Sequence, residues 1–139
     1  MPQDAKIRLD SSKIRSLNFK VKEGEFKSPV SITYNLSYGY EYNYKEKCIN
    51  VLLSLSINED QLPFVLDIEY EGLFKLNKRA AKKKIEPFAQ INCPAILFPF
   101  LRECVADITR RAGFNPLLLP AINFIELAKR QEAEEKSQP

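Results

Sequence analysis

The sequence contains no histidine among its 139 residues. Histidine is the usual general base of enzymes and the commonest metal ligand, so its absence excludes Ser-His and Cys-His catalytic pairs. Glycine is also scarce, with four residues, and neither a G-x-G-x-x-G pattern nor a P-loop pattern occurs. These absences argue against most familiar enzyme classes, and we expect no catalytic residue, no cofactor and no bound metal.

Cysteine is sparse as well, with three residues at Cys48, Cys93 and Cys104. Their number is odd and no C-x-x-C spacing is present, so neither a disulfide framework nor a zinc site is predicted. A reducing cytoplasm is the expected compartment. Residues 1–22 lack the apolar core of a signal peptide. No apolar run approaches the roughly 20 residues of a membrane span.

The charge balance is mild, with a net charge of +3 from 21 basic and 18 acidic residues. Apolar residues make up 45% of the chain, enough for a core, and the length fits one domain over residues 1–139. We expect residues 1–4 and 132–139 to be flexible. Basic residues cluster between Lys75 and Lys84. Such a run can bind phosphate, but it is more often a solvated linker, and we favour the linker.

Alternation of apolar and polar residues predicts four strands. The irregular spacing between Lys6 and Val21 predicts one bent or interrupted strand, whereas the alternation over Ile32–Tyr44 is strict and places a row of tyrosines on one face. Two further alternations span Ile49–Ile57 and Phe64–Tyr70. Short turns between successive strands predict an antiparallel meander with one buried face.

Beyond the last strand the apolar period lengthens to that of a helix. Residues 77–88 form a basic crossover with room for a helical turn. Pro94 suits the first turn of a long helix that ends at Gly113, and Pro99 should kink that first turn or set it off.

A second helix is expected to begin at Phe124 and to end near Ala133, because Asn123 can cap it and Glu126 completes a capping-box-like pair. Strands followed by helices predict an α+β fold: a four-stranded antiparallel sheet with one long and one short C-terminal helix packed on one face.

The loop between the two predicted helices is unusually apolar. It contains Leu117, Leu118 and Leu119, and Pro116 and Pro120 exclude a regular helix or a central strand. Connecting loops are normally polar and run over the surface. Each leucine therefore either closes the core or lines a binding groove, and the sequence favours neither alternative.

The chain from residue 92 to residue 124 resembles the SecB family of bacterial protein-export chaperones. The matching motifs are C-P-x-x-L-F-P-[FY]-x-R-E at Cys93–Glu103, the helix end at Arg110–Phe114, and L-x-L-P-x-x-N-F at Leu117–Phe124. Upstream, Phe64–Phe74 resembles the family's fourth strand. The first sixty residues match only in their strand pattern.

The resemblance implies a homotetramer built as a dimer of dimers, and an ATP-independent holdase that binds unfolded polypeptides in long apolar grooves and keeps precursors competent for export. The implied groove residues come from the tyrosine strand and from the apolar loop: Tyr34, Tyr38, Tyr40, Phe114, Leu117, Leu118, Leu119, Ile122 and Phe124. The resemblance also implies that Val65, Asp67 and Glu69 face the export motor SecA. A solvated sheet face is the alternative reading of these three residues.

The net positive charge departs from the acidic composition of typical export chaperones, so other functions stay open. One alternative is a SecB-like chaperone dedicated to a single partner, such as the antitoxin of a toxin–antitoxin system. Another is a small-ligand or nucleic-acid binding domain that uses the tyrosine face and the lysine run. Salt-dependent nucleic-acid binding would favour the latter.

Overall fold

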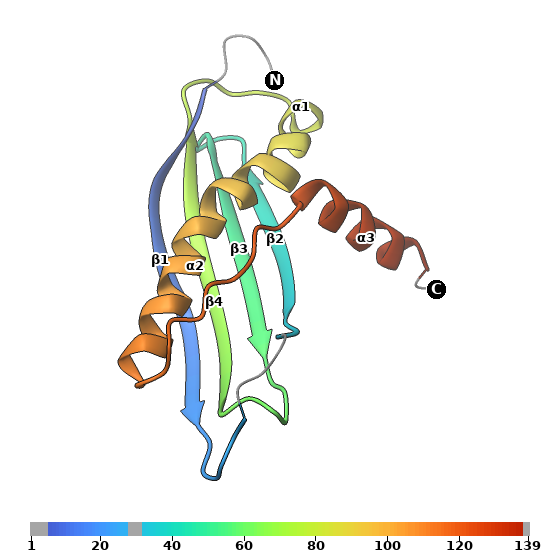
Figure 1. Ribbon diagram of the computed structural model, residues 1–139. Coiled ribbons are helices and arrows are strands. Elements are labelled where there is room, and N and C mark those ends of the chain that lie inside the picture. The colour runs from blue at the N-terminus through green and yellow to red at the C-terminus, as the bar shows by residue number, and fades with distance from the viewer. Residues whose placement is uncertain (1–5, 28–31, 138–139) are drawn as a thin grey trace.

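The computed structural model describes residues 6–27 and 32–137. Four strands form one antiparallel sheet in the order β1-β4-β3-β2, and a long helix crosses one face of that sheet (Figure 1). The elements, in chain order, are β1 (Ile7–Val21), β2 (Asn35–Asn43), β3 (Cys48–Ile57), β4 (Phe64–Leu76), α1 (Lys82–Pro87), the π-helical turn η1 (Phe88–Asn92), α2 (Cys93–Arg111) and α3 (Phe124–Ser137). The predicted α+β fold is confirmed. Of the ends expected to be flexible, residues 1–4 and 138–139 lie outside the described residues, whereas α3 continues to Ser137.

The meander prediction holds for β2, β3 and β4 but is wrong for β1. β1 pairs with β4, at the opposite edge of the sheet from β2. Hairpin turns of two to five residues join only neighbouring strands, and the connection between Val21 and Asn35 is longer than that. It therefore lets the chain cross from one edge of the sheet to the other.

Two register shifts explain the irregular sequence of β1. They lie between Leu9 and Ser11 and between Ile14 and Ser16. A β-bulge adds one residue to a strand, so two apolar residues on either side of it can lie on the same face of the sheet although they are three positions apart. The step from Ile14 to Leu17 spans such a bulge. As a result, the residues that pair with the buried face of β4 are Ile7, Leu9, Ser12, Ile14, Leu17, Phe19 and Val21.

The long helix α2 begins at Cys93, so Pro94 lies in its first turn as predicted. Helical structure also precedes α2, because α1 begins at Lys82 and continues through η1 into α2. The Cys93 amide donates to the Phe88 carbonyl, five residues back, as in a π-turn. Pro94 has no amide hydrogen to donate, and the wider turn lies directly before it. Pro99 lies within α2 and does not end it.

The core lies between the sheet and α2. Leu97, Leu101 and Val105 of α2 are buried against the sheet. Gly72 of β4 allows this close approach, because a Cβ atom there would lie 2.8 Å from the Leu97 Cδ1. The segment after α2 then runs back across the same face of the sheet and places Leu119 in the core (Figure 1).

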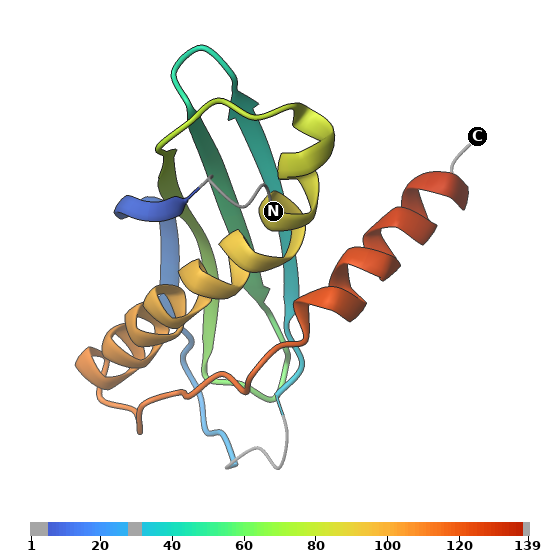
Figure 2. The same ribbon diagram turned by 90° about the horizontal axis from the view of Figure 1, so that it is seen from above.

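The short helix α3 begins as predicted. The Asn123 side-chain oxygen accepts hydrogen bonds from the amides of Ile125 (3.1 Å) and Glu126 (3.2 Å). Phe124 is buried and meets the Tyr38 ring edge-on, with the centroids 6.1 Å apart. The remaining turns of α3 extend away from the body beside the β2 edge (Figure 2). No helix in the described part of the chain is long and apolar enough to cross a bilayer.

Candidate functional site

A largely apolar hollow lies at the end of the sheet where β4 begins. The segment after β1, the turn before β4 and the loop after α2 meet there and enclose about 590 Å³. This volume lies within the range of small-molecule and side-chain pockets. We call this hollow the apolar groove, and its lining residues are Gly24, Phe26, Lys27, Ile32, Leu62, Pro63, Phe64, Phe114, Asn115, Pro116 and Leu117.

Stacked phenylalanine rings form one wall of the apolar groove. Phe64 is buried, and its ring lies 5.5 Å from the ring of Phe114 and 5.5 Å from that of Phe19, measured between centroids. Aromatic pairs at this separation stabilise one another beyond the effect of burial alone. The half-buried Phe114 ring is therefore fixed from behind by Phe64 and lines the groove with its remaining surface.

The loop that forms this wall is fixed to the end of α2. Gly113 has a φ of +93°, its amide donates to the Arg110 carbonyl (3.0 Å), and the Phe114 amide donates to the Thr109 carbonyl (3.1 Å). This pair of bonds is a Schellman motif, which satisfies the last carbonyls of a helix and turns the chain. The predicted stop at Gly113 is confirmed.

A buried threonine, which the sequence pattern did not single out, also anchors the loop to α2. Thr109 Oγ1 donates to the Val105 carbonyl (2.9 Å) and accepts from the Leu117 amide (2.9 Å). Thr109 is fully buried and Leu117 is half-buried, so this part-buried bond joins the loop to the body of α2. The sequence did contain a signal for this anchor, because Thr109 is a polar residue four positions after Val105, on the face of the helix that is buried.

The three leucines of the loop have three different environments. Leu117 is half-buried and lines the apolar groove, Leu118 is 64% exposed, and Leu119 is 1% exposed. Phe124 is also a core residue, at 5% exposed, whereas Ile122 is half-buried. Leu119 and Phe124 therefore offer almost no surface to a ligand and belong to the core, and their proposed place in a groove is not supported.

The predicted tyrosines lie on the helix-covered face of β2, as the alternation required. Tyr38 and Tyr40 do not line the apolar groove. They line a separate hollow of about 240 Å³ between β2, η1 and α3, which we call the tyrosine hollow. Gln131 of α3 closes one side of this hollow, since its side-chain oxygen accepts a hydrogen bond from the Tyr38 amide (3.3 Å). Burial, the Glu132 carboxylate and Tyr40 raise the pKa of Tyr38, which keeps its hydroxyl protonated.

Tyr34 packs against the core without lining either hollow. It is half-buried, and burial raises its pKa. The predicted groove residues thus divide between the apolar groove, the tyrosine hollow and the core. Phe26, Ile32 and Pro63 complete the apolar groove and were not predicted for it. Ile32 is the first residue of the tyrosine alternation, so the sequence shows that it is apolar. The sequence does not predict that Ile32 lines the same groove as Phe114.

The acidic residues of β4 lie on the opposite, uncovered face of the sheet. Asp67 is exposed and accepts a hydrogen bond from the Ser56 hydroxyl (2.7 Å), and Val65 beside it is half-buried. Glu69 lies 4.0 Å from the Arg15 guanidinium, and Arg15 therefore offsets part of the negative charge of this face. Lys13 does the same for the neighbouring Glu71, at 3.3 Å.

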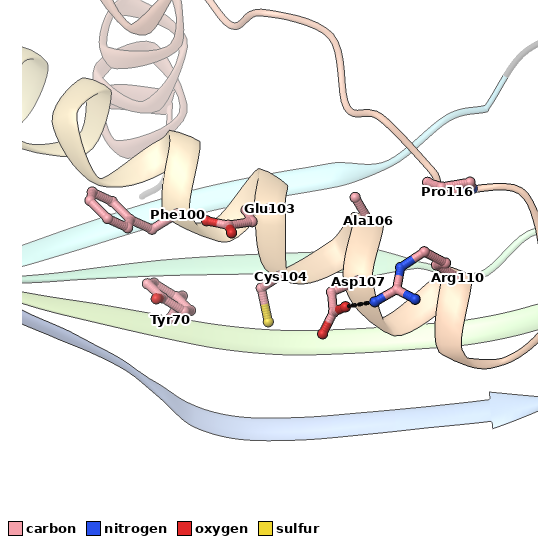
Figure 3. Close-up of a pocket in the computed structure, with 8 residues that line it drawn as sticks. All are labelled: Tyr70, Phe100, Glu103, Cys104, Ala106, Asp107, Arg110 and Pro116. Atoms are coloured by element: carbon pink, nitrogen blue, oxygen red, sulfur yellow. Dashed lines mark hydrogen bonds and ion pairs between the residues drawn. The ribbon is translucent and has the colours of Figure 1, made fainter.

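A further hollow of about 420 Å³ lies along α2 above β4 (Figure 3). Its polar wall contains Asp107, which accepts hydrogen bonds from Arg110 and from Arg111 (2.9 Å for the latter), and both bonds lower the pKa of Asp107. Burial raises the pKa of the Cys104 thiol, which disfavours the reactive thiolate. Within the described residues, no group of three potential metal ligands comes together.

The sheet has a long helix and an apolar loop on one face and an aromatic groove beside that loop, which is the arrangement that the resemblance to the protein-export chaperones implies. The family model described as preprotein translocase subunit SecB matches residues 15–135 of this chain. The chain therefore belongs to the SecB family.

Relatives extend this finding. A protein-export protein SecB from Paramagnetospirillum magneticum is 32% identical over 143 aligned residues, covering 95% of this chain and 89% of the relative. Another, from Afipia carboxidovorans, is 38% identical over 86 residues, which cover 58% of this chain and about half (53%) of that protein.

Solved structures show the same fold at low sequence identity. A SecB-like chaperone of Mycobacterium tuberculosis, Rv1957, solved with a ChAD peptide from the Rv1956 HigA1 antitoxin, is 19% identical, with a TM-score of 0.65 over 84% of this chain and 90% of that one. A protein of unknown function from Streptococcus agalactiae is 13% identical and has a TM-score of 0.53, covering 84% and 98% of the two chains.

Proposed function

We propose that this protein is an ATP-independent holdase that binds unfolded precursor polypeptides in the apolar groove and keeps them competent for the Sec translocase. The observation that carries the proposal is the groove itself, in which Phe26, Ile32 and Phe114 line a hollow beside the apolar loop. Membership of the SecB family supports the export role. The reduced cysteines suit action in the cytoplasm.

The two hollows on the helix-covered side suggest how one site binds many sequences. The apolar groove lies at the start of the loop and the tyrosine hollow lies beside α3, at its end. An extended polypeptide that follows the loop reaches both, and the exposed Leu118 lies between them along the chain. Each hollow accepts a few apolar side chains weakly, and simultaneous occupation multiplies the affinity without reading a fixed sequence.

A dedicated chaperone is the second candidate, and one observation favours it. Arg15 and Lys13 of β1 pair with Glu69 and Glu71, so the face predicted to receive SecA carries mixed rather than acidic charge. The Mycobacterium tuberculosis structure shows that a SecB-like chaperone can bind a peptide of an antitoxin. On this alternative the same grooves bind one partner, and SecA is not recruited.

Self-association to a homotetramer completes the proposal. Among the described residues, five large apolar side chains on β1 and α2 are more than 40% exposed in the single chain: Ile14, Leu17, Val21, Ile96 and Phe100. β1 is also an edge strand, whose free backbone groups favour pairing. A second copy of the chain that covers this surface would bury both features.

The direct test compares a groove variant with a matched variant on the outer face. Ile32→Ser combined with Leu117→Ser removes two half-buried apolar side chains from the apolar groove. Leu52→Ser combined with Leu73→Ser removes two half-buried leucines from the uncovered face. We expect the first to lose suppression of aggregation of a chemically unfolded client and the second to retain it. Equal holding by both would contradict the proposal.

A further inference from the structure

Basic side chains gather at the end of the sheet that lies farthest from the apolar groove. β4 begins beside that groove at Phe64 and ends at Leu76, next to the β2–β3 turn and the crossover to α1. Nine of the 21 basic residues lie at this end, which we call the basic end: Lys6, Lys45, Lys47, Lys75, Lys78, Arg79, Lys82, Lys83 and Lys84.

The crossover at the basic end is fixed to the sheet. The Tyr42 hydroxyl donates to the Ala80 carbonyl (2.6 Å) and accepts from the Ala80 amide (3.2 Å). The Arg79 guanidinium donates to the Lys45 carbonyl (3.1 Å), and its Cζ lies 5.9 Å from the centre of the Tyr44 ring. The crossover is therefore ordered at Arg79 and Ala80, and its basic side chains are exposed to solvent, as expected of a solvated linker.

A hollow of about 810 Å³ opens within the basic end, where Lys82 of α1 faces the end of β2. Tyr44 is 55% exposed and meets the Tyr42 ring edge-on, with the centroids 6.5 Å apart and the planes at 81°. The amide side chains of Asn43 and Asn50 also line the hollow. It thus combines an aromatic surface, hydrogen-bonding amides, the cations of Lys45 and Lys82, and a single carboxylate, that of Glu41.

This chemistry fits a single-stranded nucleic acid. Lysines neutralise phosphates, an exposed aromatic ring stacks on an unpaired base, and amides bond base edges or the 2′-hydroxyl of ribose. A membrane surface fits less well, because an interfacial helix or loop buries several apolar side chains. Tyr44 is the one large, exposed hydrophobic side chain that the described residues place at this end.

We propose that the basic end binds single-stranded RNA, with its lysines on the phosphates and Tyr44 stacked on a base. This surface is separated from the apolar groove by the length of β4, so RNA and an unfolded polypeptide can be bound together. The proposal does not depend on the holdase function, because its lysines and Tyr44 line neither the apolar groove nor the hollow beside α3; Tyr40 alone is shared with the latter.

The test is a fluorescence-anisotropy titration of a labelled, mixed-sequence RNA 20-mer with the full chain at several KCl concentrations. The key variant reverses three charges by Lys82→Glu, Lys83→Glu and Lys84→Glu. The first turn of α1 contains no acidic residue, and glutamate near a helix N-terminus is favourable, so this variant should fold. We expect at least tenfold weaker binding and a log–log salt slope smaller by about 2, since each contact to single-stranded nucleic acid contributes about 0.7.

The matched control is Lys20→Glu with Lys129→Glu and Arg130→Glu, which makes the same change in net charge on exposed residues elsewhere. We expect this control to bind RNA within about threefold of wild type, and Tyr44→Ala to bind at least fivefold more weakly while Tyr44→Phe binds normally. No binding by wild type at low salt, equal losses in both triple variants, or binding of phosphatidylglycerol vesicles in place of RNA would overturn the proposal. Client holding should be unchanged in the Lys82–Lys84 variant.

Discussion

The Thr109 hydroxyl accepts a hydrogen bond from the Leu117 amide at 2.9 Å, and this part-buried bond fixes the apolar loop to the last turn of α2. Both the wall of the apolar groove and the path of the chain into the core depend on where Leu117 is fixed. Thr109 is therefore a positioning residue for the groove, although its own side chain is buried.

Thr109→Val keeps the shape of the side chain and removes the acceptor. The part-buried Leu117 amide then lacks its partner, which should lower the free energy of unfolding by about 0.5–1.5 kcal/mol. Hydrogen exchange of the Leu117 amide should accelerate, and the affinity for an unfolded client should fall. Thr109→Ser restores the hydroxyl and should restore both amide protection and client affinity. Normal Leu117 protection in Thr109→Val would show that the bond does not position the loop.

Leu118 and Leu119 are adjacent leucines with opposite roles. Leu119→Ser removes a core side chain and should lower stability by about 2–5 kcal/mol, as other large-to-small core changes do. Leu118→Ser changes a side chain that is 64% exposed and should alter stability by less than about 0.5 kcal/mol. Client binding should weaken in the folded Leu118→Ser variant. Thermal denaturation and a client-binding titration on both variants separate stability from binding, and full binding by Leu118→Ser would remove this residue from the site.

The sequence was sufficient for the fold class because periodicity reports which face of each element is buried. It placed the tyrosines of β2 and the Asn123 cap correctly. It could not place β1 beside β4, since pairing depends on contacts between residues far apart in the chain. It also could not separate Leu118 from Leu119, because a loop has no fixed period from which to read the direction of its side chains.

The predicted site was harder to assemble than the fold. Phe26 and Ile32 reach Phe114 only because the end of the sheet and the end of α2 meet there, which no local pattern encodes. The charge of the basic run predicts its exposure to solvent, but it does not predict that the backbone of the run is ordered. The Tyr42–Ala80 hydrogen bonds that order this run join residues 38 positions apart.

A substitution at Asp67 tests whether the uncovered face recruits SecA. It is exposed on the uncovered face, where a change of charge should leave folding intact. If this face receives SecA, Asp67→Lys should weaken binding at least tenfold, measured by calorimetry against purified SecA, without altering client holding. The opposite change, Arg15→Gln, removes the Arg15 ion pairs with Glu69 and Glu71, leaves Lys13 beside Glu71, and should strengthen SecA binding. Absence of SecA binding by wild type would favour the dedicated chaperone.

Substitutions on the exposed apolar surface of β1 and α2 test the proposed assembly into a tetramer. Light scattering of the wild type should give a mass of about 64 kDa, four times the chain mass of 16.0 kDa. Ile14→Asp and Phe100→Asp each place a charge among exposed apolar side chains, where burial against a second copy would be costly. Both variants should yield smaller species at micromolar concentration. A monomeric wild type would contradict the proposed tetramer.

An unfolded polypeptide is proposed to contact the apolar groove, and site-specific photo-crosslinking measures which positions of the chain it contacts. A benzoylphenylalanine is introduced at Lys27 or Asn115, two exposed positions on the apolar groove, or at the exposed outer-face positions Ser37 or Asp67. Each protein is irradiated with the same labelled, permanently unfolded polypeptide. We predict efficient crosslinks from Lys27 and Asn115 and only background from Ser37 and Asp67. Equal crosslinking from all four positions, or crosslinks from the outer face alone, would contradict the assignment of the apolar groove as the client site.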